Sequence, residues 1–182
     1  MKTFKLAIML ALTTILGSCD WTLGDGGGPP YFDLALSFQD TSGKDLVKGI
    51  AYIKEDPLDL HGYVDQNSYW LCGIEGEREP GKVYPFNTAM YYNSPELFNE
   101  NDDEYHRLSF STVSSKSKVT FTFLLNLPHV FGDNTKHEIV AYCNKKRRNH
   151  AFTYDCYRLV FDGKDIETTR NGRFHYADII LN

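Results

Sequence analysis

The sequence predicts an all-β domain, most simply an antiparallel β-sandwich, with a partly closed β-barrel as the alternative. Short runs of alternating apolar and polar residues, separated by turn residues, follow one another along most of the chain. The chain also contains 12 Tyr and 12 Phe, whose side chains pack well on pleated sheets. Only the segment NSPELFNE (93–100) has the early proline and glutamate that favour the first turn of a helix.

Residues 1–18 are predicted to be a bacterial lipoprotein signal peptide that is removed. Two lysines precede an apolar run only half as long as a membrane span of ~20 residues. The run ends in Leu16-Gly17-Ser18-Cys19, which has the pattern of a lipobox. Only a thiol can form the thioether to diacylglycerol, and more than one acyl chain gives lasting attachment. We therefore expect a lipid on Cys19; the alternative is an ordinary secretory signal with an incidental cysteine.

Residues 19–30 are predicted to be the lipidated cysteine and a flexible Gly/Pro linker, because glycines dominate this stretch and two prolines end it. Residues 31–182 then form a single domain, long enough to bury a stable core without a metal. The formal net charge of -5 becomes -7 when residues 1–18 and their two lysines are removed. An acidic protein is a poor partner for nucleic acid, whose phosphates need a basic surface.

The first part of the domain contains three strand patterns. These are YFDLALSF (31–38), LVKGIAYI (46–53) and SYWLCGI (68–74). The turn cluster QDTSGKD (39–45) separates the first two. We expect its aspartates to stabilise the turn rather than to bind calcium, because Lys44 would repel the cation.

A hairpin is expected around residues 114–117, which separate two strongly alternating segments. Closing this turn sets Leu108 opposite Phe123 and Phe110 opposite Phe121. All four apolar side chains then share one face, as in a buried antiparallel pair.

The C-terminal part is predicted to be a series of hairpins. KHEIVAYC (136–143) and CYRLVF (156–161) pair around a basic loop. Asp-Gly at 162–163 and Asn-Gly at 171–172 are typical of two-residue hairpin turns.

Three cysteines remain once Cys19 is assigned to the lipid. In an oxidising compartment an odd number predicts one disulfide and one unpaired thiol. Cys143 and Cys156 are the better pair, because they lie in two strand patterns joined by a polar loop. The alternative is three buried free thiols, Cys72 included.

Three segments are similar to parts of small envelope lipoproteins of the Bacteroidetes: FQDTSGKDLVKGIAYI (38–53), HVFGDNTKHEIVAYCN (129–144) and CYRLVFDGKDI (156–166). Those proteins share a lipobox, an early Asp-x-x-Gly-x-Asp-Leu turn and a β-rich body. The resemblance extends over most of residues 31–182. It implies an immunoglobulin-like sandwich held by lipid at the cell envelope, and it brings no catalytic residues. We expect the outer membrane as the location, on its periplasmic or outer side, although Asp20 after the cysteine does not settle which membrane holds the protein.

The residues that could bind a ligand are aromatic. Trp70, Tyr69, Tyr91 and Tyr92 lie in the least regular part of the sequence, where flat rings with polar tips would suit stacking on sugars. Buried tyrosines with satisfied hydroxyls are the alternative. The sequence has no catalytic, phosphate-binding or dinucleotide motif and no metal-ligand spacing, so we expect no catalytic residue, metal or cofactor.

Two charged runs leave alternatives open. Residues 145–148, Lys-Lys-Arg-Arg, are expected as exposed cations at a loop tip, or as a contact for phosphate groups of lipids or lipopolysaccharide. Residues 100–106 are acidic and are expected to form a solvated loop. Asp102, Asp103 and Glu104 would be the carboxylates if the protein were a hydrolase.

The leading functional hypothesis is a non-enzymatic binding or interaction module anchored in the envelope by lipid, with a glycan or protein ligand. The second is an accessory structural subunit of a fimbrial or nutrient-uptake assembly, joined through an exposed edge strand. The third is an envelope hydrolase.

Overall fold

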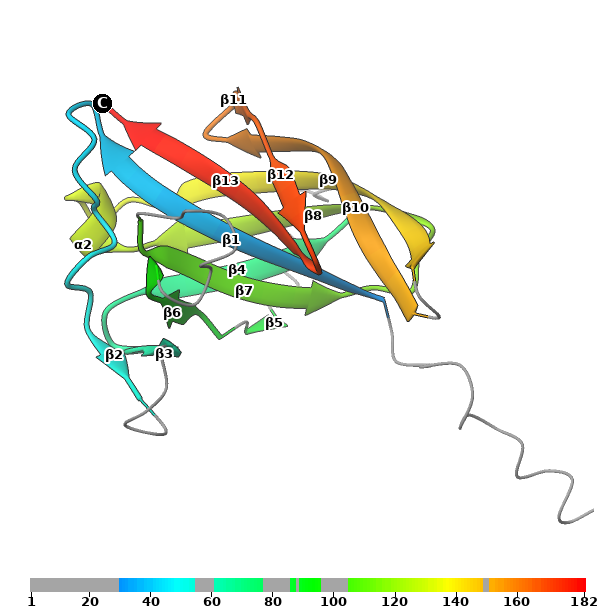
Figure 1. Cartoon of the computed structure of the whole chain (residues 1–182), viewed down its shortest axis with the longest axis horizontal. Helices are drawn as coiled ribbons and strands as arrows, with labels where there is room; N and C mark the ends of the chain where they lie inside the picture. The colour runs from blue at the N-terminus through cyan, green and yellow to red at the C-terminus, as the bar shows by residue number, and fades with distance from the viewer. Residues whose placement is uncertain (1–29, 55–60, 77–85, 88, 96–104, 149–150) are drawn as a thin grey trace, which may run out of the picture.

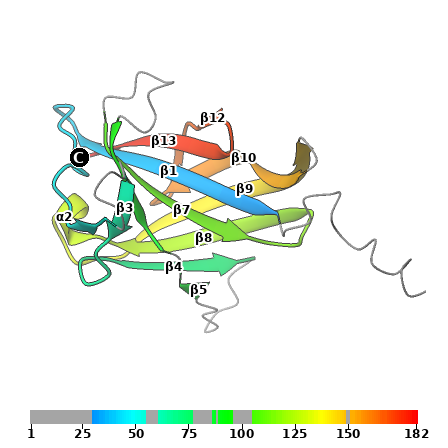
Figure 2. The ribbon, with the colours of Figure 1, turned by 60° about the horizontal axis from the view of Figure 1, so that its bottom comes forward.

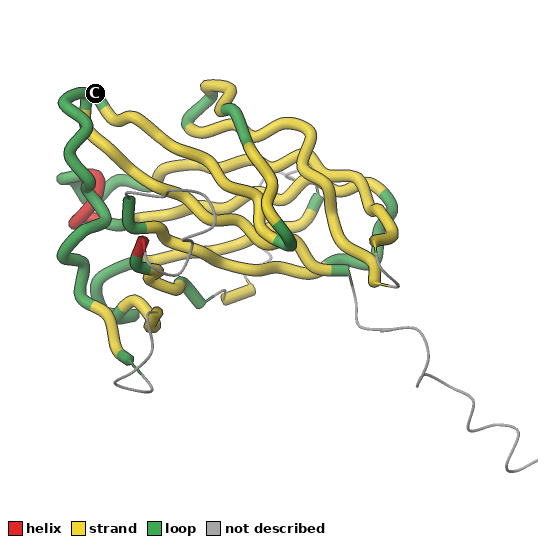
Figure 3. The backbone as a smooth tube through the Cα atoms, viewed as in Figure 1, coloured by secondary structure: helices red, strands yellow, loops and turns green. Residues whose placement is uncertain are grey.

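The computed structural model describes residues 30–54, 61–76, 86–87, 89–95, 105–148 and 151–182. These residues contain one short helix, α2 (Pro128–Phe131), and thirteen strands, and Figure 3 shows how strongly strands dominate. The strands are β1 (Tyr31–Asp40), β2 (Tyr52–Ile53), β3 (His61–Val64), β4 (Trp70–Glu75), β5 (Phe86–Asn87), β6 (Tyr91–Asn93), β7 (Arg107–Val113), β8 (Lys118–Asn126), β9 (His137–Arg148), β10 (Ala151–Phe161), β11 (Lys164–Ile166), β12 (Thr169–Asn171) and β13 (Phe174–Leu181). The all-β class is confirmed.

All thirteen strands belong to one mixed sheet. Its main order is β2-β3-β6-β7-β1-β10-β9-β8-β4-β5, and β11, β12 and β13 pair with β10, β13 and β1. The expectation of a purely antiparallel sheet is wrong, because β1 runs parallel to β13 from Asp33–Phe174 to Asp40–Leu181. β1 is the first strand and β13 the last, so the connection between them is long enough for the chain to return in the same direction, as parallel pairing requires. Among the described strands the order ends at β2 and β5, so the sheet is not closed as the alternative barrel would be.

The sheet packs against itself through aromatic side chains. Phe32 of β1 stacks on Phe121 of β8 with ring centroids 5.5 Å apart, and Phe110 of β7 lies 4.7 Å from Phe123 of β8. Neither β1 nor β7 forms backbone pairs with β8. These contacts therefore join the two halves of the sheet across the hydrophobic core. Figure 2 shows β1 above β8 and β4.

The expected hairpin around residues 114–117 is wrong. β7 pairs with β1 and β6, whereas β8 pairs with β4 and β9. The amide of Ser114 donates to Pro30 (3.1 Å), while the carbonyl of Ser117 accepts from Lys145 (2.8 Å), so the two ends of this segment join different halves of the sheet. The buried face was correctly identified, because an alternating pattern shows which side of a strand is buried and not which strand lies beside it.

The first turn is confirmed, but the strand after it is shorter than expected. Asp40 accepts hydrogen bonds from the backbone amides of Ser42 (2.8 Å) and Lys44 (3.0 Å), as an aspartate-stabilised turn should. Of the predicted strand 46–53, only Tyr52–Ile53 is a strand. Before it, the amide of Leu46 donates to Phe38 of β1 (2.9 Å), and the amides of Val47 and Lys48 donate to the side chain of Asp45.

The C-terminal hairpins are mostly confirmed. β9 and β10 pair as expected, but the basic residues 145–148 lie within β9 and not in a loop. Asp162 (φ 47°) and Gly163 (φ 80°) form the predicted turn into β11. The turn between β12 and β13 lies one residue later than the predicted Asn171-Gly172 turn, because Asn171 pairs with Phe174 and the first central residue is Gly172 (φ 57°). A glycine with positive φ is favoured at the first of the two central residues of a two-residue hairpin turn.

The helix expected at 93–100 lies mostly outside the described residues, and its first residue, Asn93, belongs to β6. The helix α2 follows β8 and was not predicted. Pro128 occupies its first turn, and Gly132 ends it in a left-handed conformation (φ 75°). A helix of four residues is too short to show a periodic pattern in the sequence.

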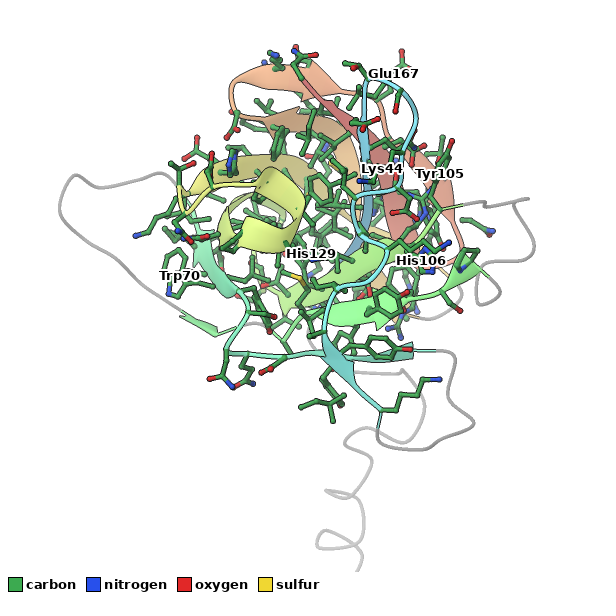
Figure 4. All side chains as sticks on the ribbon, turned by 90° about the vertical axis from the view of Figure 1, so that its left-hand side faces the viewer. Lys44, Trp70, Tyr105, His106, His129 and Glu167 are labelled. Atoms are coloured by element: carbon green, nitrogen blue, oxygen red, sulfur yellow. The ribbon has the colours of Figure 1, made fainter. Side chains whose placement is uncertain are left out.

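The two ends of the sheet differ, and we name them for the sections that follow. The N-proximal end contains Pro30, where the described chain begins, together with residues 114–118, 145–148 and 151–154 (Figure 1). The far end contains the turn 40–50, helix α2 and residues 105–106. Figure 4 looks onto the far end, where Lys44, His106 and His129 are labelled.

Candidate functional site

Trp70 and Tyr69 do not form an exposed pair. The Trp70 side chain is 41% exposed at the start of β4, and the ammonium of Lys136 lies 4.4 Å from the centre of its ring. Tyr69 is half-buried against the core, and its hydroxyl accepts a hydrogen bond from the Met90 amide (3.1 Å). Trp70 and His106 lie on opposite sides of the far end in Figure 4. Trp70 therefore stands apart from the other aromatic candidates.

Tyr91 and Tyr92 belong to a larger group of rings, which we call the aromatic cluster: Tyr52, Tyr63, Tyr91, Tyr92 and His106. On one face of the strands, Tyr52, Tyr92 and His106 stack in a row with centroid distances of 4.3 Å and 5.3 Å. On the other face, Tyr63 lies 4.7 Å from Tyr91. Successive residues of a strand point to opposite faces, so β6 supplies one ring to each.

Gly62 makes the stack possible. This residue lies in β3, directly opposite Tyr92 of β6. A Cβ atom at this position would be 2.6 Å from Cδ2 of Tyr52 and 2.6 Å from the carbonyl oxygen of Ile53. Only glycine therefore lets the Tyr52 ring lie over β3 and reach Tyr92.

Asp45 fixes the position of His106, which is the end of the stack away from Tyr52. One of its carboxylate oxygens lies 2.8 Å from both the backbone amide and Nδ1 of His106, and the other accepts from the amides of Val47 (2.9 Å) and Lys48 (3.1 Å). Burial alone would raise the pKa of Asp45, but these hydrogen bonds outweigh burial and hold the pKa below its ordinary value. A charged carboxylate therefore joins the turn 45–48 to the ring of His106.

The outer end of the aromatic cluster is accessible. Tyr52 is 37% exposed and Ile53 is 61% exposed, and both lie in β2 at one end of the strand order. Lys54 follows, with its ammonium 5.9 Å from the Tyr52 ring. An exposed tyrosine on a rigid stack offers a flat apolar surface with a hydroxyl at its rim, which suits stacking on a sugar ring or contact with a protein side chain.

The sequence indicated half of this arrangement. Tyr91 and Tyr92 were candidates, whereas Tyr52 and His106 were not, because they are remote from each other and from β6 along the chain. No periodic pattern could have joined them, since the stack depends on which strands become neighbours.

Cys143 and Cys156 face each other across β9 and β10. They are direct register partners, and a β-bulge follows Cys156. The structure contains both as free thiols, so the disulfide stays a prediction. The Cys143 thiol donates to the sulfur of Cys156, which raises the pKa of Cys143 and lowers that of Cys156.

A second polar group, which the sequence did not indicate, is buried where β13 meets β1 and β10. His175 Nε2 accepts the amide of Cys156 (3.1 Å), and burial followed by repulsion from Arg170 lowers the pKa of His175 to about 4. Asp33, whose Oδ1 accepts from Ser111, is also buried, and burial raises its pKa. Asp33 and His175 are buried, so we assign them a role in packing and in the pH dependence of stability.

Other predicted sites lie outside the described residues. These are Cys19 of the lipobox and the carboxylates Asp102, Asp103 and Glu104. In the part of the chain that the structure describes, no three His, Cys, Asp or Glu side chains come together as metal ligands. No helix among the described residues has the length and apolar character needed to cross a membrane.

Comparison with known protein families, curated proteins and solved structures finds no match to this chain. The resemblance to Bacteroidetes lipoproteins therefore stays a prediction from the sequence.

Proposed function

We propose that the protein is a non-enzymatic binding module, held at the bacterial cell envelope by a lipid on Cys19, that contacts its ligand through the aromatic cluster. The stack of Tyr52, Tyr92 and His106 carries this proposal, because it ends in exposed side chains at a sheet edge. The chain enters the sheet at the opposite end, beside Val113 and Thr153. An anchor attached there leaves the aromatic cluster free to meet a ligand.

The same proposal includes the architecture and the location. Contacts such as Phe32–Phe121 between the two halves of the sheet support an immunoglobulin-like sandwich for the body. The lipobox supports removal of residues 1–18, a linker over 19–30 and attachment to a membrane of the envelope, for which we propose the outer membrane. Intact mass of the protein from its native host tests the anchor. An acylated chain beginning at Cys19 is expected, and an unmodified chain beginning at Met1 would refute it.

A glycan is the ligand class that the aromatic cluster suits best, because exposed tyrosine rings bind sugars by stacking and by hydrogen bonds at the hydroxyl. The test is electrophoresis of the protein through gels containing soluble starch, xylan or mannan. We expect retardation in at least one polysaccharide, lost in Tyr52→Ala and retained in Tyr157→Ala, a matched exposed tyrosine in β10. Equal retardation of both variants would contradict the role of the aromatic cluster.

The second candidate is an accessory subunit of a surface assembly. The position of β2 at the end of the strand order favours it, because an edge strand can accept a strand from a partner. Blue-native electrophoresis of solubilised membranes separates the two. Migration in a large complex that Ile53→Lys abolishes supports the subunit, whereas migration as a monomer supports the binding module.

A further inference from the structure

The N-proximal end carries a dense group of cations, and it is also where the chain enters the sheet. Pro30 accepts a hydrogen bond from the Ser114 amide (3.1 Å), and Tyr31 pairs with both Val113 and Thr153. The described chain therefore begins at this end of the domain (Figure 1). If Cys19 is the lipid attachment point, this end lies nearer to the bilayer than the far end.

Six basic residues gather here although the whole chain is acidic, with a net charge of -5. The amide of Lys145 donates to Ser117 (2.8 Å), and Lys118 pairs with Asn144, so the two basic segments are adjacent. We call this group the basic end; its members are Lys116, Lys118, Lys145, Lys146, Arg147 and Arg148.

Two carboxylates contact the basic end in the described residues. Glu75 lies 3.3 Å from the ammonium of Lys116. Asp155 contacts Lys146, and its other oxygen lies 3.5 Å from Arg148. Glu75 and Asp155 offset part of this charge, and the density of cations gives the basic end a local attraction for anions although the protein as a whole is acidic.

Apolar side chains lie among these cations. Phe152 is 43% exposed, pairs with Arg147 in the neighbouring strand, and has the ammonium of Lys145 4.7 Å from its ring centre. Val113, beside Tyr31, is 51% exposed. Exposed aromatic and aliphatic groups bordered by lysine and arginine are typical of surfaces that lie at the membrane–water interface.

A hollow of about 230 Å³ lies beside these cations. Its lining includes Lys116, Lys118, Thr120 and the exposed Tyr157. Gly76 also lines it. Two ammonium groups and two hydroxyls around one open hollow suit a phosphate group.

We propose that the N-proximal end docks on the anionic bilayer in which the lipid anchor is embedded. The basic end contacts the lipid phosphates, and Phe152 and Val113 enter the interfacial layer. This inference rests on the proposed anchoring at Cys19. It gives the domain a fixed orientation, with the aromatic cluster directed away from the membrane. A soluble polyanion would be attracted by the cations alone and would leave the two apolar side chains without a role.

The test is hydrogen exchange of the full-length mature protein on vesicles. Vesicles of phosphatidylcholine with 30% phosphatidylglycerol are compared with vesicles of phosphatidylcholine alone, the 30% being a probe composition chosen to be roughly as anionic as a bacterial leaflet. We expect amides of residues 114–118, 145–148 and 151–152 to exchange about tenfold more slowly on the anionic vesicles, and those of the turn 41–44 to be unchanged. High salt should remove the protection, because it screens the charges.

Matched charge reversals identify the surface responsible. Lys118→Glu with Lys145→Glu should abolish the protection, and the milder Lys118→Gln with Lys145→Gln should reduce it. Lys44→Glu with Lys48→Glu, which changes two exposed lysines of the far end, should leave it intact. Circular dichroism of each variant confirms that it is folded.

The outcomes separate this inference from the proposed anchoring. Acylated protein that sediments with vesicles but shows no protection of the basic end would overturn the docking and leave the anchor standing. Unacylated protein that is still protected on anionic vesicles would support the docking and refute the anchor. Equal protection by soluble dextran sulfate would overturn the bilayer in favour of a polyanion partner.

Discussion

The two ends of the molecule each contain an aspartate with several partners, but the partners differ in kind. Asp45 at the far end binds three backbone amides and the ring of one histidine. Asp155 at the N-proximal end binds the side chains of Lys146, Arg148 and Arg170. The first aspartate shapes a turn, whereas the second neutralises part of a group of cations. Similar residues thus build a rigid surface at one end and a charged surface at the other.

This difference extends to the turns of the far end. Asp40 and Asp133, like Asp45, accept hydrogen bonds from backbone amides two residues further along. Hydrogen bonds from their own turns lower the pKa of Asp40 and Asp133. Asp40, Asp45 and Asp133 therefore stabilise the turns of the far end, and their positions need no ligand to explain them.

The largest expected effect tests whether one core supports both ends. Phe32 lies toward the N-proximal end and Phe38 toward the far end, and both are fully buried. Phe32→Ala and Phe38→Ala should each lower the free energy of unfolding by about 3–5 kcal/mol, because each leaves a cavity among aromatic rings. Urea unfolding measures this change. A loss below about 1 kcal/mol at one position would show that the two ends have separate cores.

The next effect concerns acid. The pKa of His175 is about 4 in the folded protein and near 6.5 in the unfolded chain. Between these two values the unfolded chain binds a proton on His175 and the folded protein does not. Stability should therefore fall by about 3 kcal/mol between pH 6.5 and pH 4. In His175→Phe this pH dependence should be much weaker. Denaturation at several pH values tests it, and an unchanged slope in the variant would contradict it.

Gly62→Ala should destabilise the aromatic cluster without reaching the basic end. A methyl group at this position meets Tyr52 and the backbone of Ile53, and such overpacking costs about 1–3 kcal/mol. The near-ultraviolet circular dichroism of the tyrosines should change with it. The double variant Gly62→Ala with Tyr52→Ala should lose less unfolding free energy than the two single variants lose together. Without the Tyr52 ring, the methyl group at position 62 meets only the backbone of Ile53. Strict additivity would count against the stack.

The smallest effect compares the two aspartates directly. Asp45→Asn should cost about 1–3 kcal/mol and be insensitive to salt, because an amide nitrogen would then face the His106 amide. Asp155→Asn should cost about 1 kcal/mol or less, because its partners are mostly exposed. That cost should fall as salt is raised. Thermal unfolding at 0.05 and 0.5 M NaCl, on either side of ordinary ionic strength, separates the two; equal salt dependence would remove the contrast.

Sequence reasoning succeeded wherever the signal was local. The alternation in β1, the aspartate turn at Asp40 and the Asp162-Gly163 turn are each defined by a few adjacent residues. It failed for the hairpin at 114–117, where the same buried face fits either a neighbouring strand or one across the core. It also placed the cations of 145–148 in a loop, because four successive charges do not reveal that a strand continues through them.

The sequence by itself determined that this chain forms strands, which sides of them are buried, and where several turns occur, because these depend on short-range periodicity and turn chemistry. The lipid anchor at Cys19 stays a prediction from the sequence. Only the tertiary structure decided that β1 lies parallel to β13, that Tyr52, Tyr92 and His106 stack, and that the cations gather where the chain enters the sheet. These features join residues far apart along the chain, and strand pairing is chosen by the packing of the whole core.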